Sequence, residues 1–91
     1  MKQVCIQGLG FVGLAMAIAL SNVKTAKGNT KYFVTGVDLP TEQGLKKIDA
    51  VNSGTLPFNT ADQKMVTAFL EAKKVGNLVA TTDESTYELA D

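Results

Sequence analysis

Three short apolar runs divide the chain, and each has the residue types of a β-strand. They are VCI at residues 4–6, YFVTGV at residues 32–37 and LVAT at residues 78–81. β-branched and aromatic residues favour extended backbone, and short apolar runs without polar alternation are typical of strands inside a parallel sheet. We therefore predict three strands and expect the first to be buried on both faces.

The segments between these runs carry apolar residues at helical spacing, which predicts helices. After the first run, the inward face of a helix is formed by Leu14, Ala17, Ile18 and Ser21. The polar stretch KTAKGNTK then predicts a long loop before the second strand. After the second run, Thr41 is placed to cap a helix that Gly54 ends in the left-handed conformation. This second helix presents one apolar face, formed by Leu45, Ile48 and Val51.

A third helix is predicted between residues 60 and 76. Thr60 and Gln63 have the spacing of a capping box, and Gly76 is suited to end the helix. We expect its apolar stripe to lie in the core rather than to contact a cofactor; the stripe consists of Met65, Val66, Phe69 and Leu70.

The order of these elements predicts an α/β fold. After the third strand, Asp83 or Ser85 is placed to cap a further helix that runs through YELAD. The chain thus reads strand, helix, strand, two helices, strand and the start of a helix. Such alternation is typical of a parallel sheet with right-handed crossovers. Ninety-one residues allow one small domain.

The first strand runs directly into a glycine-rich segment, Gly8 to Gly13, with the pattern G-x-G-x-x-G. Two hypotheses compete for it. Lys2 and the apolar run from Leu9 to Leu20 have features of a secretory signal peptide. A strand before the glycines, a helix after them and Asp38 at the end of the next strand instead favour a dinucleotide-binding turn. The distance from Gly13 to Asp38 exceeds the usual spacing of about 20 residues, and the long polar loop accounts for the excess.

Each position of this turn has a physical reason in the dinucleotide hypothesis. Gly8 allows the tight turn, Gly10 lets the backbone approach a pyrophosphate, and Gly13 lets the helix pack closely on the sheet. Asp38 would accept hydrogen bonds from a ribose and repel a 2′-phosphate, which favours NAD over NADP. The candidate cofactor-binding residues are Gly8, Leu9, Gly10, Phe11, Val12, Gly13 and Asp38. A plain crossover whose glycines serve packing alone remains the alternative.

Composition removes other kinds of chemistry. Nine basic residues balance nine acidic ones, so no excess charge favours nucleic acid or an anionic membrane. The chain has no His and one Cys, which excludes His-based catalysis, Cys/His metal sites and an internal disulfide. We expect no metal and no catalytic residue here, and the single thiol suits a reducing, cytoplasmic compartment.

The chain resembles the nucleotide-sugar dehydrogenases of the UDP-glucose/GDP-mannose dehydrogenase type. The matching segments, in order, are GLGFVGL, GVD, VNSGTLP and LVATTDESTYELAD. The resemblance implies that the chain is the NAD-binding part of an enzyme that oxidises the C6 hydroxyl of a UDP- or GDP-linked sugar to a carboxylate. It also implies a Rossmann-type fold in which Gly8 to Gly13 and Asp38 hold NAD.

The sequence departs from the family pattern in several places. Residues 58–61 are FNTA where the family often has EPGL, and Gln43 stands where a basic residue is common, with Lys46 or Lys47 as substitutes. The family's fourth strand, substrate domain and catalytic Cys and Lys would follow residue 91. Cys5 does not replace that Cys, because a cysteine within a strand is usually inert.

We therefore expect residues 1–91 to be the first half of a doubly wound parallel sheet, truncated before the fourth strand and inactive alone. In the strand order 3-2-1, the first strand has a bare edge, which predicts either self-association through Val4 to Ile6 or earlier loss of the missing half. Other dehydrogenases, of the hydroxyacyl-CoA or phosphogluconate type, remain alternatives. So do a non-catalytic nucleotide-binding or interaction module and a small secreted protein.

Overall fold

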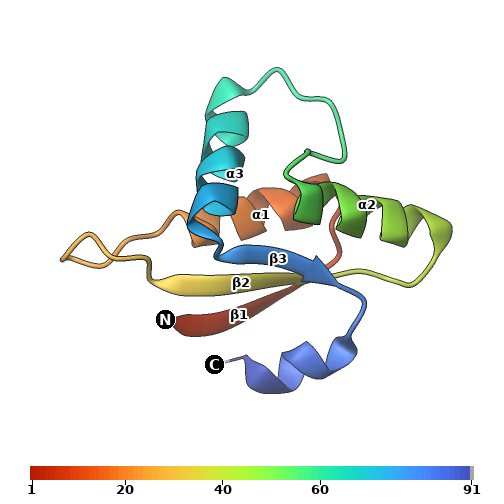
Figure 1. The fold of residues 1–91 in the computed structure, drawn as a ribbon, viewed down its shortest axis with the longest axis horizontal. Coiled ribbons are helices and arrows are strands. Elements are labelled where there is room, and N and C mark those ends of the chain that lie inside the picture. The colour runs from red at the N-terminus through yellow and green to blue at the C-terminus, as the bar shows by residue number, and fades with distance from the viewer. Residues whose placement is uncertain (91) are drawn as a thin grey trace.

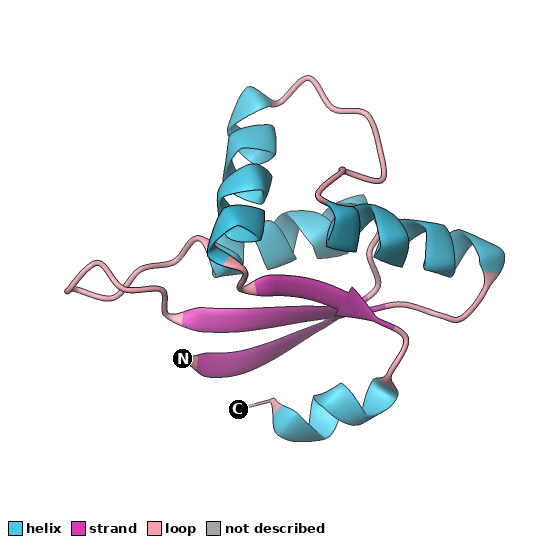
Figure 2. Ribbon diagram, viewed as in Figure 1, coloured by secondary structure: helices cyan, strands magenta, loops and turns pink. Residues whose placement is uncertain are grey.

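A computed structural model describes residues 1–90 of the chain as a three-stranded parallel sheet with helices on both faces (Figure 1). The elements, in order, are β1 (Lys2–Gln7), α1 (Phe11–Ser21), β2 (Tyr32–Val37), α2 (Glu42–Ser53), α3 (Gln63–Val75), β3 (Leu78–Thr81) and the 3₁₀ helix η1 (Glu84–Leu89). Helices α1, α2 and α3 cover one face of the sheet, and η1 lies on the other (Figure 2). The predicted β-α-β-α-β pattern is confirmed.

The sheet has the order β1-β2-β3, and all its strands are parallel. Val4, Val34 and Leu78 lie in register across it and point to the face that the three α-helices cover. The core forms there, because these side chains meet the buried faces of the helices. The sheet therefore fixes the carboxyl ends of all three strands along one border.

The structure confirms the inward face of α1, since Leu14, Ala17, Ile18 and Ser21 are all buried. Residues 22–31 form the predicted loop, with one antiparallel bridge between Lys24 and Thr30. The residues on either side of this loop are held together by Asn77, a buried residue directly before β3. Its Nδ2 donates two hydrogen bonds, one to the Ser21 carbonyl and one to the Tyr32 carbonyl. This amide ties the end of α1 to the start of β2.

Helix α2 begins and ends where the sequence predicts. Thr41 Oγ1 accepts a hydrogen bond from the Gly44 N–H, and Gly54 has a left-handed φ of 86°. The predicted apolar face is wrong at one position, because Leu45 is exposed and Gly44 is buried instead. A Cβ at Gly44 would lie 1.9 Å from the Leu39 carbonyl oxygen, so the helix packs directly on the preceding loop at that point.

Helix α3 begins two residues later than the predicted capping box. Asp62, not Thr60, caps it, by accepting from the N–H groups of Lys64 and Met65. Its buried residues are Met65, Phe69 and Ala72, whereas Leu70 is exposed and the prediction for Leu70 is wrong. Gly76 ends the helix in the left-handed conformation, as predicted.

Two expectations about the ends of the chain also need correction. Strand β1 is only half-buried at Val4, Cys5 and Ile6, because it lies at the edge of the sheet. Asp83 caps the last helix as predicted, but that helix is a 3₁₀ helix that ends at Leu89. Within residues 1–90, no helix is long and apolar enough to cross a membrane.

Candidate functional site

The glycine-rich segment forms a turn at the carboxyl end of β1, between that strand and α1 (Figure 1). Gly8 adopts a φ of 89°, a left-handed conformation that a side chain would strain. Its N–H still donates to the Val37 carbonyl of β2 at 2.8 Å. The turn therefore starts inside the hydrogen-bonded sheet, and its position relative to β2 is fixed.

Asp38 lies beside this turn, as the dinucleotide hypothesis requires. Its Oδ2 accepts a hydrogen bond from the Leu9 N–H at 2.8 Å, and its Oδ1 accepts one from the Leu39 N–H at 2.8 Å. The chain thus brings together residues 29 positions apart at the border of the sheet. Each carboxylate oxygen accepts one N–H here and keeps a further lone pair for a ligand.

Leu9 anchors the turn rather than facing solvent. Its side chain is fully buried in the core, and its N–H is taken by Asp38. Gly36 in β2 makes this possible, because a Cβ there would lie 2.4 Å from Leu9 Cδ2. The buried Leu9 side chain therefore fixes the position of the turn relative to the sheet.

The two remaining glycines of the turn differ in what their missing side chains provide. A Cβ at Gly13 would lie 2.2 Å from the Gly8 carbonyl oxygen, so packing alone demands glycine there. A Cβ at Gly10 would meet no protein atom within 4 Å, and the Gly10 φ of −68° suits any residue. Packing does not explain Gly10, and the space in front of it is open.

The N-terminus of α1 is not capped by any side chain of the described residues. Gly10 is the N-cap residue, and the first helical hydrogen bond runs from the Leu14 N–H to the Gly10 carbonyl at 2.9 Å. The N–H groups of Phe11, Val12 and Gly13 precede that bond. The first turn also has no acidic residue, so the positive end of the helix dipole is not compensated within it.

Phe11 and Val12 lie at the surface of this turn. Val12 is exposed, and the Phe11 ring packs at 5.1 Å between centroids against Phe58 from the loop before α3. Phe11 is exposed as well, and so is the neighbouring Gly10. These two residues therefore bear on the site through their N–H groups.

A cavity of about 390 Å³ opens beside Gly8 and Asp38. Its lining consists of Gln7, Gly8, Val37, Asp38, Leu39, Glu84 and Tyr87. The last two come from η1 and were missed from the sequence, because no local signal shows that η1 folds back to the first turn. Partial burial, followed by the proximity of Cys5, Glu84 and Asp38, raises the pKa of the Tyr87 phenol. The phenol, like that of any tyrosine, is protonated at neutral pH, so Tyr87 can donate a hydrogen bond to a ligand in this cavity.

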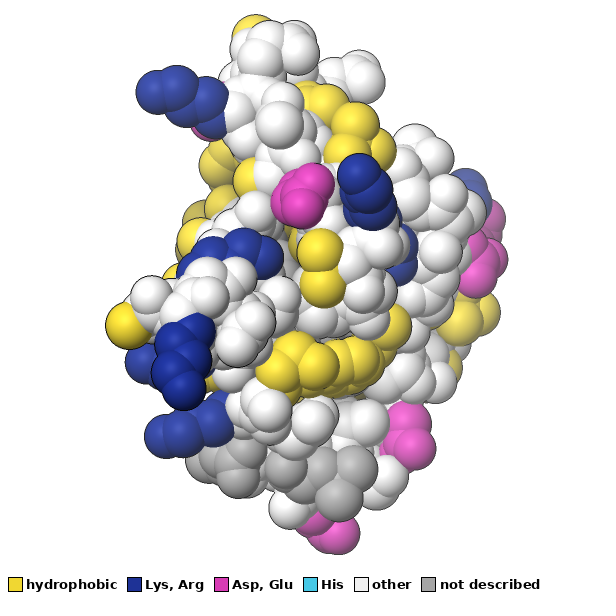
Figure 3. Space-filling view, turned by 60° about the vertical axis from the view of Figure 1, so that its left-hand side comes forward, with side chains coloured by type: hydrophobic (Ala, Val, Ile, Leu, Met, Phe, Trp, Pro, Cys, Tyr) yellow, Lys and Arg dark blue, Asp and Glu magenta, His cyan; other side chains and the backbone are white. Residues whose placement is uncertain are grey.

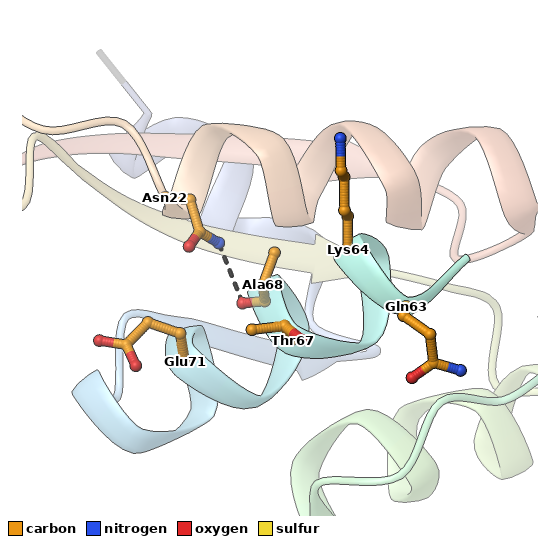
Figure 4. Close-up of a pocket in the computed structure, with 6 residues that line it drawn as sticks. All are labelled: Asn22, Gln63, Lys64, Thr67, Ala68 and Glu71. Carbon is orange, nitrogen blue, oxygen red and sulfur yellow. Dashed lines mark hydrogen bonds between the residues drawn. The ribbon is translucent and has the colours of Figure 1, made fainter. Parts of the chain in front are cut away.

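A second, more open groove of about 460 Å³ lies where the end of α1 meets α3 (Figure 4). Asn22 Nδ2 donates to the Ala68 carbonyl at 3.0 Å, and the side chains of Lys64, Gln63 and Glu71 point in different directions. The groove has no set of converging polar groups and lies at the end of α1 opposite to the glycine turn. Among residues 1–90, no cluster of acidic and Cys side chains could hold a metal ion.

Comparisons with known proteins agree with this geometry. No protein-family model and no curated protein matches the chain. Among solved structures, the NDP-N-acetyl-D-galactosaminuronic acid dehydrogenase of Methanosarcina mazei Go1 matches with a TM-score of 0.81 and 23% identity. The GDP-mannose dehydrogenase of Pseudomonas aeruginosa matches with a TM-score of 0.71 and 29% identity. The UDP-glucose dehydrogenase of Pyrobaculum islandicum matches with a TM-score of 0.73 and 20% identity.

Each of these matches covers 100% of this chain and 18% of the solved structure. The fold is that of one half of a Rossmann domain, and the proteins that share it here are nucleotide-sugar dehydrogenases. The resemblance predicted from the sequence is therefore confirmed, and the chain corresponds to the N-terminal Rossmann half of these dehydrogenases.

Proposed function

We propose that this chain binds NAD at the turn from Gly8 to Gly13, with Asp38 as the residue that holds the adenosine ribose. The observation that carries the proposal is the 2.8 Å hydrogen bond between the Leu9 N–H and Asp38 Oδ2. It places a carboxylate beside a glycine turn at the carboxyl ends of two adjacent parallel strands. Open α/β sheets bind their ligands at this border.

The pyrophosphate would lie against the N-terminus of α1. The N–H groups of Phe11, Val12 and Gly13 point out of the helix end, and the dipole favours an anion there. The absent side chain of Gly10 leaves the space that a phosphate needs. Gly8 and Leu9 serve by holding the turn in place, through the left-handed φ of Gly8 and the buried side chain of Leu9.

The ribose hydroxyls would donate to the free lone pairs of the Asp38 carboxylate. Its negative charge disfavours a 2′-phosphate, so NAD is expected to bind more tightly than NADP. NAD supplies the hydride acceptor when it is bound. The residues of this chain hold and orient it.

We also propose that the chain belongs to an enzyme that oxidises the C6 hydroxyl of a nucleotide-linked sugar, and that residues 1–91 alone do not catalyse this reaction. Cys5 supports the second point. It lies in β1 and is half-buried, and its thiol donates to Thr86 Oγ1 at 3.3 Å. The Cys5 thiol is therefore engaged within the fold, which supports a chain that binds the cofactor without catalysing the reaction alone. Incubation of the folded chain with NAD and UDP-glucose or GDP-mannose should produce no NADH.

Titration of the ¹⁵N-labelled chain with NAD, followed by NMR, tests the binding proposal. The amide signals of Gly10, Phe11, Val12 and Gly13 should shift, and NADP at the same concentration should cause smaller shifts. Gly10→Ala should fold normally and lose binding, because its new methyl group enters only the space proposed for the phosphate. Ala19→Ser, on the exposed face of the same helix, is the matched control and should bind as the unmodified chain does.

Two results would contradict the proposal. The first is a folded chain whose turn amides do not move at millimolar NAD. The second is a Gly10→Ala variant that binds NAD as well as the Ala19→Ser control does. Either result would favour the alternative in which Asp38 and the glycines only fasten the crossover to the sheet.

A further inference from the structure

The segment VNSGTLP at the end of α2 contains a side chain that reaches the sheet. Asn52 Nδ2 donates a hydrogen bond to the Ala80 carbonyl at 2.9 Å, and Asn52 Oδ1 accepts one from the Ala80 N–H at 2.9 Å. These two bonds join residues that are 28 positions apart in the sequence. Because an amide group carries a donor and an acceptor side by side, Asn52 pairs with β3 as a residue of an antiparallel strand would.

The residue that Asn52 holds lies next to a backbone contact of Asp38. The Asp38 N–H donates to the Thr81 carbonyl at 3.1 Å, so the backbone of Thr81 faces β2. Since backbone groups alternate in direction along a strand, those of Ala80 point away from β2, toward Asn52. Strand β3 is therefore held from both sides near its carboxyl end, by Asp38 on one side and by Asn52 on the other.

The other end of α2 contacts the residue that follows Asp38. Helix α2 runs from the loop after β2 back to the carboxyl end of β3 (Figure 1). A Cβ at Gly44 would lie 1.9 Å from the Leu39 carbonyl oxygen, so the first turn of α2 packs directly on Leu39. The Leu39 N–H in turn donates to Asp38 Oδ1 at 2.8 Å. Because a helix is a rigid element, a shift at the Asn52 end also displaces the end that packs on Leu39.

We propose that Asn52 is a positioning residue for the Asp38 carboxylate, because it fastens α2 to β3 and thereby sets where the two carboxylate oxygens lie. This inference rests on the proposed function, in which Asp38 holds the adenosine ribose. Within residues 1–90, the cavity beside Asp38 is lined from β1 and its turn, from β2 and its loop, and from η1, but not from α2. Asn52 therefore acts on a bound nucleotide through Asp38. A hydroxyl donates well only between about 2.5 and 3.0 Å, so a small shift of the carboxylate weakens its bonds to the ribose.

The first measurement needs no ligand. In ¹⁵N NMR spectra of the folded chain, Asn52→Ala should shift the amide signals of Leu9 and Leu39, whose N–H groups donate to Asp38. Leu9 belongs to the turn after β1, so its signal reports the position of the carboxylate.

Asn22→Ala is the matched control for this measurement. Asn22 also ties the end of a helix to another element, since its Nδ2 donates to the Ala68 carbonyl of α3. It lies at the end of α1 remote from the glycine turn, and that turn is bonded to β2 through the Gly8 N–H. Asn22→Ala should therefore leave the signals of Leu9 and Leu39 in place.

The second measurement is the NAD titration of the same variants at a temperature where each is folded. Asn52→Ala should raise the dissociation constant for NAD about fivefold and reduce the preference for NAD over NADP. Asn52→Leu, which is similar in size but has no polar group, should behave in the same way. In the Asp38→Ala background, Asn52→Ala should have no further effect on NAD affinity, because the residue through which it acts is gone.

All these substitutions at Asn52 are uncharged by design. Nucleotides are anions, so their affinity responds to any change of charge on the protein. Basic and acidic side chains lie together on the surface, as the face in Figure 3 shows, and a neutral substitution leaves this distribution unchanged. A weaker affinity in these variants therefore reports the position of Asp38 and not a different electrostatic field.

Three results would overturn the proposal. The first is a folded Asn52→Ala variant in which the amide signals of Leu9 and Leu39 do not move, or move no more than in Asn22→Ala. The second is a loss of NAD affinity that is as large without the Asp38 carboxylate as with it. The third is an Asn52→Leu variant that behaves as the unmodified chain does. If the unmodified chain binds no NAD, the proposed function fails, and the amide signals still decide whether Asn52 positions Asp38.

Discussion

The turn after β1 and the turn after β2 do the same structural task in different ways. Each leads from the carboxyl end of a strand into a helix on the same face of the sheet. The second turn supplies the groups that stabilise the N-terminus of its own helix. Thr41 Oγ1 accepts a hydrogen bond from the Gly44 N–H at 3.1 Å, and Glu42 is an acidic residue in the first turn of the helix. The first turn has Gly10 as N-cap residue and neither of these features. Of the two helix ends, only that of α1 is left ready for an external anion.

The turn after β3 strengthens this contrast. There Asp83 caps η1 by accepting hydrogen bonds from the Ser85 N–H and hydroxyl, which lower the pKa of the Asp83 carboxyl. Two of the three turns at this border therefore carry their own side-chain acceptor. A missing cap is a better sign of a ligand than a glycine by itself, since glycines occur in both kinds of turn.

The turns that lead into α1 and α2 also have one packing feature in common. Gly13 and Gly44 each lie where a Cβ would come within 2.2 Å of a backbone carbonyl oxygen, that of Gly8 in one case and of Leu39 in the other. Both glycines let a helix pack directly against the chain that precedes it. The first turn thus contains one glycine that its left-handed backbone requires, Gly8, one that packing requires, Gly13, and one that neither requires, Gly10.

The largest expected loss of stability comes from substituting the two closely packed glycines, Gly13 and Gly44. Gly13→Ala and Gly44→Ala should each reduce the free energy of unfolding by about 3 kcal/mol, because the added methyl group must displace backbone. Gly10→Ala should cost less, about 1 kcal/mol, because alanine is a poorer N-cap residue than glycine. Urea denaturation followed by circular dichroism measures all three. If Gly10→Ala destabilises as much as Gly13→Ala, packing explains the whole motif and the comparison fails.

Asp38→Ala should cause the next largest loss of stability. It leaves the N–H of the fully buried Leu9 without a partner, which should cost about 2 kcal/mol of stability. Asp49→Ala, at an acidic position on the exposed side of α2, is the control and should have little effect. A loss of NAD binding at temperatures where Asp38→Ala is still folded would show that the carboxylate does more than fasten the turn.

The smallest effects come from exchanging the caps. Thr41→Ala removes the acceptor at α2 and should cost about 1 kcal/mol. Gly10→Ser supplies an acceptor at α1 and should stabilise the chain by about 0.3 kcal/mol. Both values are measurable as shifts in the denaturation midpoint. A Gly10→Ser variant that is stabilised and still binds NAD fully would show that the open helix end is not the phosphate site.

Much of the fold could be predicted from the sequence, because it depends on local signals. The periodicity of α1 gave its four buried residues, and Thr41, Gly54 and Gly76 were correctly placed at helix ends. The errors have physical causes that are not local. Leu45 and Leu70 are exposed because the buried face of each helix is centred one or two residues away, at Gly44 in α2 and at Ala72 in α3. Helix α3 begins at Gln63 because Asp62 accepts the hydrogen bonds of its first turn. The half-buried state of β1 follows from its place in the sheet.

The site was predictable only in part for the same reason. The turn and Asp38 follow from a pattern of spacing, and the structure does bring them together. The contribution of η1 to the cavity could not be predicted, since Glu84 and Tyr87 are more than 45 residues from Asp38 in the sequence. Nor could the role of Gly36 be predicted, because a glycine within a strand indicates close packing without naming its partner.

Leu9 occupies a notch in the sheet that exists because residue 36 has no side chain. The sizes of these two residues are therefore linked, and a relative with alanine at position 36 should carry a shorter residue at position 9. The linkage reaches further, because the Leu9 N–H is joined to the Asp38 carboxylate. A buried substitution in the middle of β2 would thus move the Asp38 carboxylate and, if the proposed NAD site is right, alter its cofactor selectivity from a distance.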